Sequence, residues 1–236
     1  TLDGETRMLL GARLRTVAEL IGSYRRVADI GSDHAYLPAW LILQDKADFV
    51  VAGEIQAGPL EAANRTVCEA ALEDCIAVRL GDGLTVLQPG EVDMVVIAGM
   101  GGPAISGILT RSPEIVRRLS RIVCQPMTGA AGLRRWLQEN GWMIVAEELV
   151  WDEGRLYEVL AAEPGLSEPL SDLLLEVGPL LWRQRHPLLP AHFDRLLHQY
   201  QNRVQSMKQS HCVNVAEQRG VWERKIEALE AMKACL

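Results

Sequence analysis

VADIGSDHA, residues 27–35, is the stretch of sequence from which the fold can be predicted. A run of small and β-branched apolar residues leads to an acidic side chain and then to a glycine, and residues 35–41 continue with helix-like spacing of their apolar side chains. This order predicts a strand, a tight loop and a helix. In an open α/β sheet, such a junction is where the ligand binds.

The loop departs from the dinucleotide-binding fingerprint, which has three glycines. Gly31 is present, whereas Asp33 and Ala35 occupy the places of the second and third glycines. A carboxylate at Asp33 would repel a pyrophosphate, which disfavours a nicotinamide or flavin dinucleotide. A ligand with an amino group or a sulfonium would suit the loop, and S-adenosylmethionine carries both. Alternatively, Asp33 only caps the following helix.

Strands and helices are expected to alternate along the chain. Predicted strands lie at about residues 25–30, 48–54, 76–80, 92–98 and 121–125. Predicted helices lie at about residues 5–22, 35–45, 59–71, 103–109, 114–120 and 130–140. Residues 142–150 and 155–162 predict an antiparallel hairpin. The sum is an α/β fold, a doubly wound sheet with an antiparallel edge hairpin.

A stretch rich in Pro, Gly, Ser and Glu at residues 164–169 predicts a linker, which separates a domain at residues 1–165 from one at residues 170–236. In the second domain, apolar residues are spaced as in heptads, at Phe193, Leu197, Tyr200, Val204 and Met207 and again at Trp222, Ile226, Leu229 and Leu236. Two helices are expected there, with the break near residues 210–214 or at Gly220. They form a coiled-coil-like arm or pack on the first domain.

Charge is unevenly distributed along the chain. The net charge of −7 argues against nucleic acid as a partner, but residues 171–236 carry 9 Lys and Arg against 7 Asp and Glu, and also four of the five histidines. A basic C-terminal segment suits binding to nucleic acid.

The five cysteines have no Cys-x-x-Cys spacing, which argues against a zinc site or a disulfide framework. With no apolar run of membrane-spanning length and no signal sequence, a cytoplasmic protein is expected.

Further groups suited to an adenosine ligand follow the next predicted strands. Glu54 ends the second strand and could accept hydrogen bonds from ribose hydroxyls, and Asp82 follows the third and could accept from an adenine amino group. Gly99–Gly102 follow the fourth and would let main chain approach a ligand closely. Each also has a structural interpretation as a solvated strand end, a turn or a helix cap. Together, four consecutive strand ends favour a binding site.

Several segments resemble the bacterial TrmK family of tRNA methyltransferases, which modify N1 of the adenine at tRNA position 22; they are residues 29–38, 53–59, 79–84, 97–102, 125–126, 133–137 and 154–158. The resemblance implies a Rossmann-like class I methyltransferase fold that uses S-adenosylmethionine, releases S-adenosylhomocysteine and needs no metal. It implies cofactor contacts from Asp29, Gly31, Glu54, Ile55, Asp82, Gly83, Gly99 and Met100. Family members usually have Asn after the Gln-Pro pair, where this chain has Met127.

Methyl transfer to N1 of adenine creates positive charge on the base, so an acceptor facing its amino group would stabilise the transition state. Asp33 is the first candidate, with His34 and Tyr36 to orient or stack the base. Candidate tRNA contacts are the phosphate-binding Arg13, Arg134 and Arg135, together with Gly101 and Gln125. The chain is expected to act as a monomer on tRNA, with the C-terminal arm binding tRNA by its shape.

Two other functions fit the same sequence. One is methyl transfer to another RNA, a protein or a small molecule, and the other is a non-catalytic scaffold that binds a nucleotide and recruits partners through its arm. A serine hydrolase is excluded because Ser106 lacks the glycine-flanked nucleophile elbow. No His or Cys pairs have the spacing of a metalloenzyme site.

Overall fold

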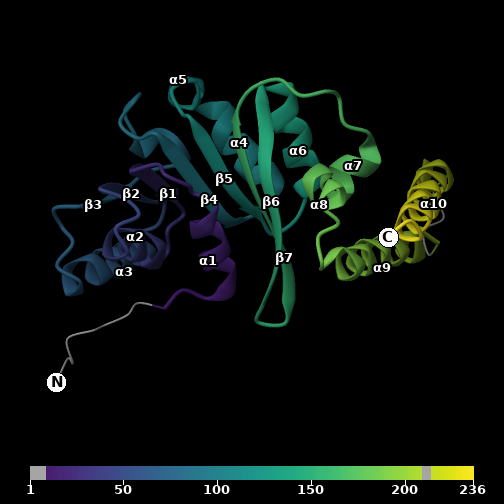
Figure 1. The fold of residues 1–236 in the computed structure, drawn as a ribbon, viewed down its shortest axis with the longest axis horizontal. Coiled ribbons are helices and arrows are strands. Elements are labelled where there is room, and N and C mark those ends of the chain that lie inside the picture. Colours follow the sequence, from purple (N-terminus) through teal and green to yellow (C-terminus); the bar gives the residue numbers. More distant parts are fainter. Residues whose placement is uncertain (1–8, 209–213) are drawn as a thin grey trace. The chain divides into compact units, whose positions relative to one another are not determined.

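The computed structural model describes residues 9–208 and 214–236 of the chain. The chain divides into two compact units, Thr1–Glu168 and Pro169–Leu236, and each is described by itself. In the first unit, seven strands form a single sheet in the order β3-β2-β1-β4-β5-β7-β6 (Figure 1). The strands are β1 (Arg26–Ile30), β2 (Phe49–Glu54), β3 (Ile76–Leu80), β4 (Met94–Met100), β5 (Arg121–Pro126), β6 (Trp142–Asp152) and β7 (Arg155–Pro164).

Strand directions confirm the predicted doubly wound sheet. β1 pairs in parallel with β2 on one side and with β4 on the other, so the chain reverses its order between β1 and β4. β7 pairs antiparallel with both β5 and β6, which forms the expected edge hairpin. In such a sheet, ligands bind beyond the carboxyl ends of the strands at the point of reversal. The end of β1 is therefore where a site is expected.

Helices cover both faces of this sheet (Figure 1). They are α1 (Ala12–Glu19), α2 (Tyr36–Leu43), α3 (Ala57–Glu69), the short 3-10 helix η1 (Gly83–Val86), α4 (Gly102–Arg111), α5 (Pro113–Val116) and α6 (Ala130–Glu139). Successive β4 side chains enter two separate apolar cores: Met94 and Val96 pack with α1, α2 and α3, whereas Val95 and Ile97 pack with α4 and α6. This alternation follows from the two-residue period of a strand.

Two predicted boundaries were wrong in ways that affect the site. α1 begins at Ala12 rather than at residue 5, with residues 5–8 outside the described part, and it ends at Glu19. β4 continues to Met100 instead of ending at residue 98, because a register shift between Ala98 and Met100 places Gly99 at φ 77° within the strand. The glycine-rich segment that was expected as a loop is thus partly a bulged strand end.

The second unit is helical. It contains α7 (Asp172–Val177), α8 (Pro179–Arg183), α9 (Leu189–Lys208) and α10 (Asn214–Lys233). Phe193, Leu197 and Val204 are buried along α9, and the rings of Tyr200 on α9 and Trp222 on α10 lie 4.9 Å apart. Gly220 lies within α10, so a break at that residue was wrong, and residues 209–213 lie outside the described part.

Arg134 was predicted to bind phosphate, and this was wrong because its side chain is buried. It is 0% exposed on α6, with Nε 2.6 Å from Glu147 of β6 and Nη2 2.7 Å from Glu158 of β7. Burial alone would lower the pKa of Arg134, but the two carboxylates raise it above its ordinary value. The ion triad fastens α6 to the edge hairpin, whereas the neighbouring Arg135 is exposed.

We expect Arg134→Met to lower the free energy of unfolding by about 3–5 kcal/mol, since it leaves two carboxylates buried without their cation. Arg135→Ala is the matched control and should change it by less than about 0.5 kcal/mol. Urea unfolding of both variants measures the difference. Equal stabilities would contradict a structural role for Arg134.

Gly102 gives a second test of the fold. A Cβ at this position would lie 2.4 Å from the carbonyl oxygen of Gly129, whereas a Cβ at Gly107 in the same helix would meet only the flexible end of Arg111, at 3.3 Å. Gly102→Ala should therefore destabilise the protein by about 1–3 kcal/mol. Gly107→Ala should be neutral or stabilising by up to about 1 kcal/mol, because Ala favours a helix. Thermal unfolding checks both, and matching losses would contradict the close backbone contact.

Candidate functional site

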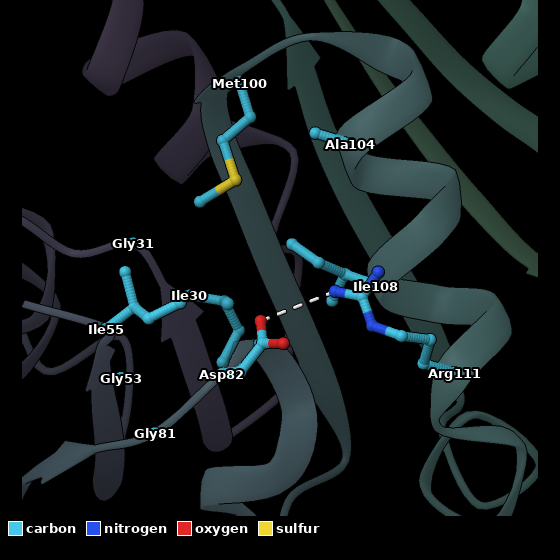
Figure 2. Close-up of a pocket in the computed structure, with 11 residues that line it drawn as sticks. Ile30, Gly31, Gly53, Ile55, Gly81, Asp82, Met100, Ala104, Ile108 and Arg111 are labelled. Atoms are coloured by element: carbon cyan, nitrogen blue, oxygen red, sulfur yellow. Dashed lines mark hydrogen bonds and ion pairs between the residues drawn. The ribbon is translucent and has the colours of Figure 1, made fainter.

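Two cavities lie at the carboxyl ends of β1–β4, and Gly31 lines both of them. The first, which we call the apolar cavity, has a volume of about 260 Å³ and is lined by Ile30, Gly31, Gly53, Ile55, Gly81, Asp82, Gly83, Met100, Ala104, Ile108 and Arg111 (Figure 2). The second, the polar cavity, has a volume of about 440 Å³ and is lined by Arg13, Leu14, Asp29, Gly31, Ser32, Asp33, His34, Tyr36, Leu37, Ala98, Gly99, Met127 and Tyr157.

The loop after β1 takes an unusual backbone path. Gly31, Asp33 and Ala35 all have positive φ, of 75°, 56° and 54°. Only glycine adopts this region freely, so the two other residues cost about 1–3 kcal/mol each. The N–H of Gly31 donates to the carbonyl of Gly53 at 2.9 Å, and the N–H of Asp33 donates to the carboxylate of Glu54. The strained path is therefore held by the end of β2.

The same geometry overturns the interpretation of Asp33 as a helix cap. The residue that caps α2 is Ala35, which has no side-chain acceptor. The Asp33 side chain is instead 72% exposed, with its carboxylate 3.8 Å from Nε2 of His34. The His34 and Tyr36 rings stack on each other with centroids 5.2 Å apart. These three residues, which were predicted to act together, form one wall of the polar cavity.

Two carboxylates are buried beneath the loop, Asp29 on β1 and Glu54 on β2, each 5% exposed. Burial raises the pKa of Asp29 to about 7, and the nearby Glu54 adds to this, whereas a 2.8 Å hydrogen bond from the Ser32 hydroxyl opposes it. Burial also raises the pKa of Glu54, and the Asp33 N–H opposes that shift. A ligand that brings positive charge into the polar cavity would favour the ionised form of Asp29.

Arg13 reaches the polar cavity from α1. Its Nη1 donates at 2.8 Å to Oε1 of Gln125, which also accepts the Gly99 N–H at 3.2 Å. The Arg13 guanidinium lies over the Tyr157 ring, 5.6 Å from its centroid. Gln125 is fully buried, and its Nε2 lies 3.7 Å from the sulfur of Met127. This network fixes the back wall of the cavity from three distant segments of the chain.

The structure brings most of the predicted site residues to one edge of the sheet. Those that line a cavity are Arg13, Asp29, Gly31, Asp33, His34, Tyr36, Ile55, Asp82, Gly83, Gly99 and Met100. Glu54 and Gln125 are buried directly behind them and contact Asp33 and Arg13. Gly101 is the N-cap residue of α4. The exposed Arg135 lies on α6, whose buried Arg134 takes no part in the site.

Several lining residues were not predicted from the sequence. Arg111 pairs with Asp82 at 3.4 Å, and it follows Ala104 and Ile108 at the spacing of one helical face, which could have identified it. Tyr157 belongs to the edge hairpin, and nothing in its local sequence indicates that β7 pairs with β5 and so brings the hairpin to the site. The position of Tyr157 depends on the order of the strands in the sheet, which is set by contacts between residues far apart in the chain.

Within residues 9–208 and 214–236, no helix is both long enough and apolar enough to cross a bilayer. In the same part of the chain, no three His, Cys, Asp or Glu side chains are grouped so that they could hold a metal ion.

Comparison with known proteins identifies the family. Residues 27–231 match the model of the TrmK family, tRNA (adenine(22)-N(1))-methyltransferase. The tRNA (adenine(22)-N(1))-methyltransferase of Bacillus subtilis is 37% identical over 206 residues, which span 85% of this chain and 87% of that protein. The crystal structure of the B. subtilis m1A22 tRNA methyltransferase TrmK superimposes with a TM-score of 0.88 at 33% identity, covering 96% of this chain and 100% of that one.

A second solved structure bears on the cofactor. The Streptococcus pneumoniae protein Sp1610, solved in complex with S-adenosyl-L-methionine, superimposes with a TM-score of 0.80 at 32% identity, covering 94% of this chain and 98% of that one. The family match extends over all four strand ends that form the two cavities and over most of the helical unit. This chain therefore belongs to the TrmK family of tRNA (adenine(22)-N(1))-methyltransferases.

Proposed function

We propose that this protein transfers the methyl group of S-adenosylmethionine to N1 of adenine 22 in tRNA. The observation that carries the proposal is the family match over residues 27–231, which includes every strand end at the two cavities. The two cavities adjoin at Gly31, as a methyl donor and its acceptor must. We propose the cytoplasm as the site of the reaction, because tRNA is the proposed substrate. We further propose that the enzyme acts as a monomer, because residues of one chain line both cavities.

The chemistry of the apolar cavity fits the adenosine half of the cofactor. A Cβ at Gly31 would lie 2.3 Å from Met100, and one at Gly83 would lie 2.8 Å from Ile108, so glycine is what keeps this space open. The cavity is mostly apolar, with Asp82 available to accept from an amino group. Glu54, at the end of β2, would accept from the ribose hydroxyls. Ile55 would pack against the adenine ring of the cofactor.

The polar cavity fits the methionine half of the cofactor and the target base. Bound S-adenosylmethionine would supply an electrophilic methyl group on a sulfonium sulfur. Asp29, partly ionised near neutral pH, would hold the amino group of the methionine half. The backbone of Gly99 and the side chain of Met100 would position the donor beside the acceptor.

Asp33 is the candidate for stabilising the reaction. N1 of neutral adenine already has a lone pair in the ring plane, so no general base is needed. Positive charge grows on the adenine as the bond forms, and the exposed Asp33 carboxylate could accept from its amino group. The stacked rings of His34 and Tyr36 offer a flat surface on which an extruded base could lie.

Binding of tRNA would use groups outside the cofactor site. Arg13 lies at the polar cavity, where it could contact a phosphate of the target nucleotide, and Arg135 is exposed on α6. Gly101 and Gln125 would support the substrate side of the site from behind. The helical unit is the basic part of the chain and is proposed as an arm that binds folded tRNA.

The activity is tested with unmodified tRNA and labelled S-adenosylmethionine, followed by nucleoside digestion and mass spectrometry. Formation of 1-methyladenosine is expected, together with its loss when adenine 22 is replaced by guanine. A tRNA that remains unmethylated, or one methylated equally after that replacement, would contradict the proposal.

Substitutions of two carboxylates separate catalysis from cofactor binding. Asp33→Asn keeps a residue that tolerates positive φ and should lower turnover about 10- to 100-fold at saturating cofactor. Glu54→Gln should weaken S-adenosylhomocysteine binding about 10-fold or more, through the lost charged acceptor. Asp45→Asn is the matched control, because Asp45 also has positive φ, of 53°, is exposed and lines neither cavity. Calorimetry and steady-state kinetics measure both effects. If Asp33→Asn mainly weakens cofactor binding and Glu54→Gln mainly lowers turnover, the proposed roles are wrong.

Removal of residues 169–236 tests the arm. The first unit contains both apolar cores, so it should fold and bind S-adenosylhomocysteine with nearly unchanged affinity. Its affinity for tRNA should fall by about 10-fold or more, since the phosphate contacts of the arm are lost. Filter binding across a salt series measures this, after thermal unfolding has verified a folded product. Unchanged tRNA affinity would show that the arm does not bind tRNA.

A further inference from the structure

One wall of the apolar cavity is a face of α4. Ala104, Ile108 and Arg111 lie at helical spacing along it, and Figure 2 shows them opposite Gly31, Gly53 and Asp82, which come from the ends of the strands. The small Ala104 and the glycines of the opposite wall leave a space for a flat ring. At one end of this space are the two charged residues that line the cavity, Asp82 and Arg111.

Arg111 and Asp82 form an ion pair across this end of the cavity. Figure 2 shows the pair as a dashed line. Nη2 of Arg111 lies 3.4 Å from Oδ1 of Asp82, and both side chains remain more than half exposed, at 58% and 57%. The other end of the guanidinium, Nη1, lies 3.3 Å from where a Cβ of Gly107 would be, so the side chain folds back along α4 over a glycine. A ligand that presents an amino group to Asp82 has to share or replace this pair.

We propose that Arg111 is a cofactor-binding residue that exchanges its partner when the cofactor binds. In the structure its guanidinium pairs with Asp82. In the complex Asp82 accepts from the adenine amino group, and the guanidinium moves onto the open face of the adenine ring. The inference rests on the cofactor of the proposed function and adds a residue to its site.

The energetics favour this exchange. An ion pair between two exposed side chains contributes little to stability, because water and salt screen it. A planar guanidinium on an aromatic face gains both stacking and cation–π attraction, and these grow as the ligand displaces water. The carboxylate released from Arg111 keeps a hydrogen-bond donor, now supplied by the ligand. Arg111 therefore gains a better partner, and Asp82 loses none.

Calorimetric binding of S-adenosylhomocysteine to the full-length protein tests the proposal. We expect Arg111→Ala to weaken binding about 5- to 30-fold and Arg111→Lys to weaken it less, since Lys keeps the charge without the planar group. In tRNA methylation, the loss should raise KM for S-adenosylmethionine more than it lowers kcat. Arg117→Ala is the matched control, because Arg117 is an exposed arginine that pairs with Glu114 instead. This variant should bind S-adenosylhomocysteine with the affinity of the parent protein.

A second ligand separates stacking from recognition of the amino group. S-inosylhomocysteine carries a carbonyl oxygen where adenine has its amino group. Arg111→Ala should weaken the binding of both ligands by a similar factor. Asp82→Asn should mainly reduce the preference of the protein for the adenine compound over the inosine compound. If Arg111→Ala leaves the affinity unchanged or increases it, or weakens only one ligand, the proposed exchange is wrong.

These outcomes are distinct from failure of the proposed function. A parent protein that binds S-adenosylhomocysteine but forms no 1-methyladenosine at position 22 would refute the methyl transfer and leave the Arg111 comparison valid. A parent protein that methylates adenine 22, while Arg111→Ala binds the cofactor product as tightly as the parent, would refute only the role of Arg111.

Discussion

The hydrogen bond from the Asp33 N–H to the buried Glu54 carboxylate is the contact on which the site depends. It holds a loop with two non-glycine residues at positive φ, which would otherwise relax toward commoner conformations. The Gly31 N–H adds a second tie, to the backbone of Gly53. Because Gly31 separates the two cavities, the fixed loop determines the shape of both. The hydrogen bond thus offsets part of the cost of the strained backbone and part of the cost of burying the Glu54 carboxylate.

The two cavities divide the chemical requirements of methyl transfer. Apolar walls and closely approaching backbone suit a neutral ring, whereas the carboxylates around the polar cavity suit an ammonium, a sulfonium and a base that becomes positively charged. Arg13 contributes a guanidinium to the lining of the polar cavity, and Gln125 and Tyr157 hold this group in place. A fixed cation there would weaken binding of a positive ligand unless the cation faces a phosphate, which is why we propose that Arg13 contacts the tRNA.

Support for the polar cavity comes from outside the site itself. Tyr157 and Asp152 reach α1 only because the edge hairpin extends from the sheet beside β5 (Figure 1). The buried pairing of Arg134 with Glu147 and Glu158 fastens the base of that hairpin to α6. Arg134, which was predicted from the sequence to bind phosphate, therefore has a structural role. It supports the strand that carries Tyr157.

The sequence by itself determined the alternation of strands and helices, the antiparallel hairpin and the acidic or glycine-rich strand ends, because period, turn residues and capping are local properties. It also placed Asp29, Asp33 and Asp82 at one edge, since parallel strands end together. Only the tertiary structure decided that Arg134 is buried while Arg135 is exposed, that Tyr157 reaches the site and that Arg111 meets Asp82. These depend on strand order and side-chain direction, and both arise from contacts between residues far apart in the chain.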